Sequence, residues 1–211
     1  MRGEPDRGNG EMTVGRRSDA PSKGDLRERA LLDAAEELLG HTSLENLTVE
    51  AIARKAGISR ASLYFYFGNK HEVLAALVER TVRTIRAHAD ATARDESTAP
   101  VEAMERAVRA TEEVWRAHGT VMRAAVDYSA LHPVVGAAWS DTVERFARTM
   151  TQVLTSAGIP DDDGPDGASA LAEALCWMTE RTFYRAACAP DGDLGRAGTT
   201  ISEIWRRAMT G

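Results

Sequence analysis

Residues 47–67 constrain the fold most, because they combine two short helical patterns with a tight turn between them. Thr48 can cap a first helix, since its hydroxyl can accept a hydrogen bond from a free amide at the helix start. Gly57 can end that helix, because glycine adopts the left-handed backbone conformation at little cost. Ser59 can then cap a second helix. Two short helices joined in this way predict a helix-turn-helix motif, whose second helix enters the DNA major groove.

The second helix of this motif carries side chains that suit DNA binding. Arg60 can contact the edge of a guanine by two hydrogen bonds. Phe65 and Phe67 are interpreted as packing residues, and the whole aromatic run could also be only the core of a small three-helix unit. The side chains that can reach phosphate oxygens, and so set the register on the duplex, are Ser62, Tyr64, Tyr66 and Lys70.

Length and composition indicate a globular protein with a proper core. The chain has 211 residues, of which 43% are hydrophobic, enough for one large or two small domains. It contains no apolar run long enough for a membrane span. Residues 1–24 are polar and rich in Gly, Arg and Asp, which predicts a disordered arm. The arm lacks the apolar segment of a secretion signal, so we expect a cytoplasmic location.

The charge distribution allows a local basic face on an acidic protein. The net charge is −6, but residues 1–72 hold 11 Lys and Arg against 12 Asp and Glu, so most of the excess lies further along the chain. Cations near the motif predict a modest, salt-sensitive affinity for DNA. These cations are Arg54, Lys55, Arg60 and Lys70. Arg16, Arg17 and Lys23 in the arm are interpreted as solvated, with phosphate contacts as the alternative.

Apolar residues recur with helical spacing along the rest of the chain, and strand-like alternation is absent. The sequence therefore predicts an all-α protein of about nine helices. A three-helix DNA-binding domain is expected at 25–72 and a ligand-binding and dimerisation domain at 73–211. The expected helices are 25–39, two within 47–67, 69–94, 101–118, 119–130, 134–157, 166–189 and a last one around Ile201 and Trp205.

Residues for catalysis or metal binding are not grouped in any known pattern. We find no glycine-rich phosphate loop, zinc-ligand spacing or nucleophile elbow. The five histidines are scattered. His118, beside an expected helix break, is interpreted as a solvated helix end, with a ligand contact as the alternative. Cys176 and Cys188 lie about 18 Å apart if they share one helix, too far to pair. We therefore expect no enzymatic activity, no metal and no cofactor.

The motif resembles the DNA-binding domain of the TetR family of bacterial regulators over about residues 25–75. The matching segments are Leu47-Thr48, Ile52-Ala53, Ala56 to Ser59, Ser62 to Phe67, Asn69-Lys70 and Val73-Leu74. The resemblance implies an all-helical homodimer, usually a repressor that leaves its operator DNA when a small molecule binds. By matching positions, the DNA-facing set would be Thr48, Arg60, Ala61, Ser62, Tyr64, Tyr66 and Lys70. Glu50 departs from the pattern, since some members carry a base-reading cation there.

The second half carries all four tryptophans, most of them on apolar helix stripes. From the residues alone, ordinary core packing is favoured over a ligand cavity. Residues 178–183, Ile204-Trp205 and Ala138 to Ser140, however, resemble a mycobacterial branch of the family that has an elongated aromatic pocket. That resemblance implies a lipophilic, mostly neutral ligand, with Thr179 as its main polar contact. The implied lining is Trp115, Trp139, Phe146, Cys176, Thr179 and Trp205, where Cys176 and Thr179 replace two asparagines of that branch.

The resemblance also implies that the last two helices form a four-helix dimer interface. Arg181 is expected to make a buried or interfacial ion pair, without facing its neighbour Glu180. Two-fold symmetry predicts a roughly palindromic operator. The alternative function is a ligand-binding or scaffolding protein of the same fold with weak or lost DNA binding. The candidate interface residues are Leu171, Leu175, Ile201, Ile204 and Ala208.

Overall fold

The computed structural model describes residues 22–93 and 98–210, with the side chains of 84–93 left out. Every regular element in these ranges is an α-helix, as the sequence predicts. The disordered arm expected at residues 1–24 lies almost wholly outside the described residues. The helices are α1 (Lys23–Leu39), α2 (Val49–Lys55), α3 (Arg60–Tyr66), α4 (Lys70–Ala93), α5 (Pro100–Ser129), α6 (Pro133–Ser156), α7 (Ala168–Cys188) and α8 (Leu194–Thr210).

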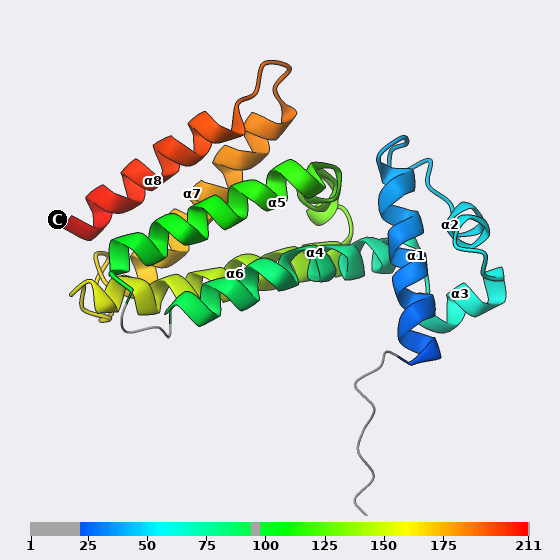
Figure 1. The fold of residues 1–211 in the computed structure, drawn as a ribbon, viewed down its shortest axis with the longest axis horizontal. Coiled ribbons are helices and arrows are strands. Elements are labelled where there is room, and N and C mark those ends of the chain that lie inside the picture. The colour runs from blue at the N-terminus through cyan, green and yellow to red at the C-terminus, as the bar shows by residue number, and fades with distance from the viewer. Residues whose placement is uncertain (1–21, 94–97, 211) are drawn as a thin grey trace, which may run out of the picture.

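The molecule is elongated, with α1 to α3 at one end and a bundle of α4 to α8 at the other (Figure 1). Helix α4 begins directly after α3 and runs along the bundle, where it packs against α5 and α6. Its buried side includes Val73, Leu77 and Val78, as the periodicity predicts. A movement inside the bundle can therefore reach the small N-terminal unit through one continuous helix.

The turn between α2 and α3 forms as its sequence predicts. The hydroxyls of Thr48 and Ser59 each accept a hydrogen bond at 3.1 Å from the amide three residues further on. Gly57 adopts φ +66°, and the amide of Ile58 donates to the carbonyl of Ala53 at 2.9 Å. This left-handed cap satisfies the last carbonyls of α2 and turns the chain sharply into α3.

The described residues form eight helices where the sequence predicts about nine, because the segments expected at 101–118 and 119–130 are joined into one element bent at the expected boundary. His118 has non-helical angles, φ −124° and ψ 27°, and the helix continues beyond it. Trp115 and Met122 are both buried on either side of this bend. The shared core holds the two segments together, so the helix is kinked next to Gly119 and does not end there. No described helix is long and apolar enough to cross a membrane.

Candidate nucleic-acid interface and buried cavity

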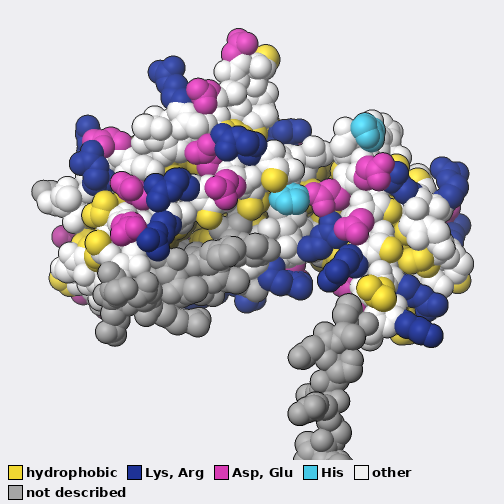
Figure 2. Space-filling view, in the orientation of Figure 1, with side chains coloured by type: hydrophobic (Ala, Val, Ile, Leu, Met, Phe, Trp, Pro, Cys, Tyr) yellow, Lys and Arg dark blue, Asp and Glu magenta, His cyan; other side chains and the backbone are white. Residues whose placement is uncertain are grey.

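The outward side of the helix-turn-helix consists mainly of α3. Arg60, Ala61 and Tyr64 are exposed on it, and Thr48 is exposed just before α2. The other three members of the predicted DNA-facing set, Ser62, Tyr66 and Lys70, are half-buried. Lys and Arg side chains at this end of the molecule are interspersed with hydrophobic ones (Figure 2). The predicted residues therefore lie on adjoining elements, α2, α3 and the start of α4.

Phe65 corrects one interpretation, because it is not a packing residue. Its side chain is 85% exposed on α3, whereas Phe67 is buried as expected. The Phe65 ring touches only the edge of Tyr66 among described aromatic rings, at a centroid distance of 5.3 Å. An exposed aromatic ring on the helix that would enter the groove can make apolar contact with a thymine methyl group.

Two of the cations around α3, Arg60 and Lys70, are engaged within the chain. Arg60 Nη1 lies 2.7 Å from Glu50 Oε1, and its Nη2 donates to the Tyr64 hydroxyl at 3.2 Å. The Tyr64 hydrogen bond and the Glu50 charge both raise the pKa of Arg60. Lys70 donates to the backbone carbonyl of Glu45 at 2.7 Å. Exposed pairs of this kind are weak, so phosphate or guanine can replace these partners.

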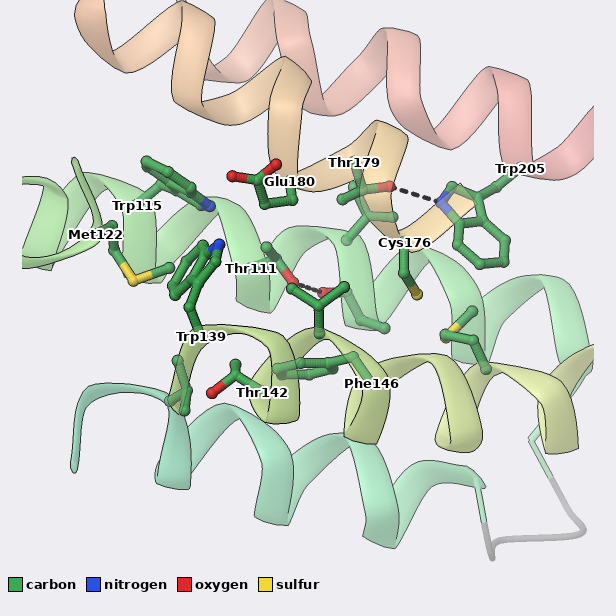
Figure 3. A pocket seen from close by; sticks show the side chains of 15 residues that line it. Thr111, Trp115, Met122, Trp139, Thr142, Phe146, Cys176, Thr179, Glu180 and Trp205 are labelled. Atoms are coloured by element: carbon green, nitrogen blue, oxygen red, sulfur yellow. Dashed lines mark hydrogen bonds between the residues drawn. The ribbon is translucent and has the colours of Figure 1, made fainter. Parts of the chain in front are cut away.

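The bundle contains a cavity of about 80 Å³ to which α4, α5, α6, α7 and α8 all contribute (Figure 3). All six residues proposed from the sequence lie in its lining, and the lining is almost entirely apolar. The indoles of Trp115 and Trp139 meet edge to face, with centroids 6.4 Å apart. Cys176 is buried in the same wall, and this burial raises the pKa of its thiol to about 12. The thiol therefore stays neutral.

The hydroxyl groups of the cavity already have partners. Thr179 Oγ1 accepts a hydrogen bond from the indole nitrogen of Trp205 at 2.9 Å. Thr111 and Thr142 donate to backbone carbonyls one turn earlier in their own helices, at 2.9 and 2.8 Å. Thr179, expected as the main polar contact for a ligand, is thus occupied in fixing the orientation of Trp205.

Glu180 is the cavity residue that the sequence analysis missed. It is only 6% exposed, and its Oε1 has no hydrogen-bond partner in the described part of the chain. Burial raises the pKa of Glu180, against the opposing effects of Arg181 and of a hydrogen bond with Trp139. The signal was available, because positions 176, 179, 180 and 183 form one helical stripe that includes Cys176 and Thr179.

Arg181 corrects a second interpretation. Its side chain is 58% exposed, so in the single chain it is not a buried ion-pair member. Arg181 Nε lies 3.6 Å from Glu180 Oε2, although the two residues are adjacent on α7. Their Cα positions diverge around the helix, but long side chains can curl back toward each other. The guanidinium also lies over the ring of Tyr184, at 5.1 Å.

A polar junction connects the two ends of the molecule. Glu36 of α1 contacts Nδ1 of His118, the residue at the bend of α5, at 2.5 Å. The other oxygen of Glu36 lies 2.6 Å from Arg80 of α4. His118 is therefore not the solvated helix end expected from the sequence. It lies between the cavity residues Trp115 and Met122 along the chain and contacts the N-terminal unit directly.

A helix-turn-helix with an exposed second helix, joined through α4 to a helical bundle with a cavity, defines a helix-turn-helix transcriptional regulator. Comparison with known proteins identifies the family. The family model "Bacterial regulatory proteins, tetR family" matches residues 31–77, and "Transcriptional regulator EthR, C-terminal domain" matches residues 104–211. The chain belongs to the TetR family, with a C-terminal domain of the EthR type. Members of this family are transcriptional regulators and not enzymes.

Individual relatives agree with this assignment. The HTH-type transcriptional regulator EthR of Mycobacterium tuberculosis is 31% identical over 207 residues, covering 93% of both chains. EthR of Mycolicibacterium smegmatis is 28% identical over 202 residues, 93% of this chain and 92% of that one. SmeT, repressor of a Stenotrophomonas maltophilia multidrug efflux pump, shares the fold with a TM-score of 0.67 at 22% identity, covering 86% and 89% of the chains. Its triclosan complex matches with a TM-score of 0.66 at 24% identity, covering 86% and 90%.

Proposed function

We propose that this protein is a cytoplasmic repressor that binds a roughly palindromic operator as a homodimer and leaves it when a lipophilic small molecule occupies the cavity. The observation that carries the proposal is the position of α4. This helix starts at Lys70, four residues beyond the end of α3, and lines the cavity with Val82. A ligand that displaces α4 at the cavity also moves the helix-turn-helix.

The size of the cavity supports this coupling. At about 80 Å³ it is smaller than the roughly 150 Å³ cavity that holds benzene in an engineered protein. A drug-sized ligand must therefore move the cavity walls apart to enter. SmeT, which shares the fold, is a repressor and has been solved with triclosan, a lipophilic phenol.

The homodimer is proposed through the outer faces of α7 and α8. Ile204 is 40% exposed on α8, and Leu171 and Leu175 are half-buried on α7. Ile201 is removed from the candidate interface, because it is fully buried within the single chain. A two-fold dimer through this face places two copies of α3 on half-sites one helical turn, or a multiple of it, apart.

Fluorescence anisotropy with DNA from directly upstream of the gene tests DNA binding. We expect tighter binding to this fragment than to a scrambled one, and weaker binding at higher salt. The protein is first unfolded and refolded to remove any ligand that it carries. Equal, weak binding to both fragments would contradict the proposal and support a ligand-binding or scaffolding role without DNA binding.

Two substitutions separate base reading from phosphate binding. Arg60→Ala should weaken specific binding by about tenfold or more and relax the preference at one base position. Lys70→Ala should weaken binding to all sequences alike and lower the salt slope by about one. Arg109→Ala, an exposed arginine on α5, is the matched control and should change neither property.

A further inference from the structure

The buried carboxyl of Glu180 is the part of the cavity that the proposed function leaves without a role. Glu180 lines the cavity, and its Oε1 lacks a hydrogen-bond partner within the described residues. Leaving such a group unsatisfied in apolar surroundings costs free energy. A ligand that supplies the missing donor would recover this cost on binding.

The carboxyl of Glu180 lies toward one end of the cavity, and aromatic side chains line both ends. Figure 3 shows the Glu180 carboxylate on the side where the indoles of Trp115 and Trp139 lie. Phe146 and Trp205 lie further along the cavity. Beside Glu180 the hydrogen bond with Trp139 brings an indole N–H to the carboxyl. The far end of the cavity can bury a hydrocarbon group.

We propose that the ligand of this cavity is a lipophilic amine. Its protonated nitrogen donates a hydrogen bond to Glu180 Oε1 beside Trp115 and Trp139, and its apolar part extends toward Phe146. This inference rests on the proposed function only in treating the cavity as the sensing site. It replaces the mostly neutral ligand, with Thr179 as its polar contact, that the sequence alone indicates.

The neighbouring groups favour an amine over other polar ligands. An anionic ligand would find no Lys, Arg or His side chain among the described residues of the cavity lining to pair with. Arg181 cannot pair with an anion bound in the cavity, since its side chain is 58% exposed and does not contribute to the cavity lining. The Thr179 oxygen already accepts from Trp205. A protonated amine gains a charge-assisted hydrogen bond with the Glu180 carboxyl.

Three probes of equal length test the proposal on the full-length protein without DNA: phenylbutylamine, phenylbutanol and phenylbutanoate. Isothermal titration calorimetry measures affinity, and quenching of tryptophan fluorescence reports occupancy of the cavity. We expect the amine to bind tighter than the alcohol by about tenfold or more, the effect of one charge-assisted hydrogen bond, and the carboxylate to bind weakest. Equal affinities, tighter binding of the carboxylate, or no binding by any probe would overturn the proposal.

Glu180→Gln locates the effect. The variant should reduce the amine-to-alcohol preference to near one while keeping the affinity for the alcohol. Glu173→Gln, an exposed glutamate on the same helix, is the matched control and should keep the preference. An unchanged preference in Glu180→Gln would overturn the assignment. The wild-type comparison of the three probes stands even if the variant does not fold.

These measurements are independent of the proposed function. If amine binding depends on Glu180 but the protein does not bind DNA, the repressor proposal fails and the amine site stands. If the protein binds operator DNA but shows no preference for the amine, the amine site fails and the repressor proposal stands.

Discussion

At the scale of single residues, the buried carboxyl of Glu180 makes the stability of the protein depend on pH. Its pKa is raised from 4.5 by burial, so the folded state binds this proton more tightly than the unfolded chain. The free energy of unfolding therefore falls as pH rises above 4.5. We expect Glu180→Gln to stabilise the protein at pH 7, with the gain shrinking toward pH 4, in urea unfolding across this range. A gain of the same size at every pH, or one shared by Glu173→Gln, would contradict this.

Phe65 and Leu63 lie two positions apart on α3 but face opposite surroundings. Phe65 is 85% exposed and Leu63 is fully buried. Phe65→Ala should change the free energy of unfolding by no more than about 0.5 kcal/mol, yet weaken binding to operator DNA. Leu63→Ala should cost about 2–5 kcal/mol because it leaves a cavity in the core. Thermal unfolding and anisotropy titrations measure the two effects, and normal operator binding by Phe65→Ala would exclude a DNA contact.

At the scale of helices, the starts of α4 and α6 meet through two stacked histidines. The ring centroids of His71 and His132 lie 3.6 Å apart, with an angle of 19° between the ring planes. The ring of Tyr128 stacks on that of His132. Burial, then His132 and Lys70, lower the pKa of His71 below 6.5. The folded state therefore resists protonation, and stability is lost as pH falls below 6.5.

We expect His71→Gln to reduce the loss of stability between pH 7.5 and 5.5 relative to wild type, as measured by thermal unfolding. His41→Gln, at an exposed position after α1, is the control and should keep the wild-type slope. A wild-type slope in His71→Gln would show that other groups set the acid sensitivity.

The helices were predictable where the determining signals are local. The caps at Thr48 and Ser59 and the left-handed Gly57 follow from residues within a few positions of each other, and the structure has all three. The cavity lining followed from resemblance, since apolar stripes alone favour ordinary core. The position of the bend at His118 was predicted, but as the end of one helix and the start of another. The packing that keeps the two segments of α5 together involves distant residues, which the sequence around Gly119 does not reveal.

What the sequence could not supply depends on contacts between distant segments. The exposure of Phe65 is set by how α3 packs on its neighbours, and an aromatic residue between other aromatics gives no local sign of it. The partner of His118 is Glu36, 82 positions away. Glu180 could have been predicted as a lining residue, because it shares one face of α7 with Cys176 and Thr179. It was missed because a charged residue is not expected among apolar lining residues.

At the scale of the whole molecule, the two ends are connected by α4 and by the junction at Glu36. This carboxylate joins α1 to Arg80 of α4 and to His118 of α5. His118 lies at the one point where α5 departs from helical geometry, between two residues that line the cavity. The bend therefore connects two lining residues of the cavity, Trp115 and Met122, with α1 through the contact between His118 and Glu36.

We therefore expect His118→Ala to uncouple the two sites. The variant should bind operator DNA and the cavity ligand with near wild-type affinity, but ligand should release it from DNA less effectively. Coupling energies between sites are typically about 1–3 kcal/mol, so the ligand-induced loss of DNA affinity should shrink several-fold. Anisotropy titrations with and without ligand measure this loss. Arg116→Ala is the control, because Arg116 pairs with Glu112 within α5 and should leave coupling intact. Full release of His118→Ala by ligand would instead place the coupling in α4 alone.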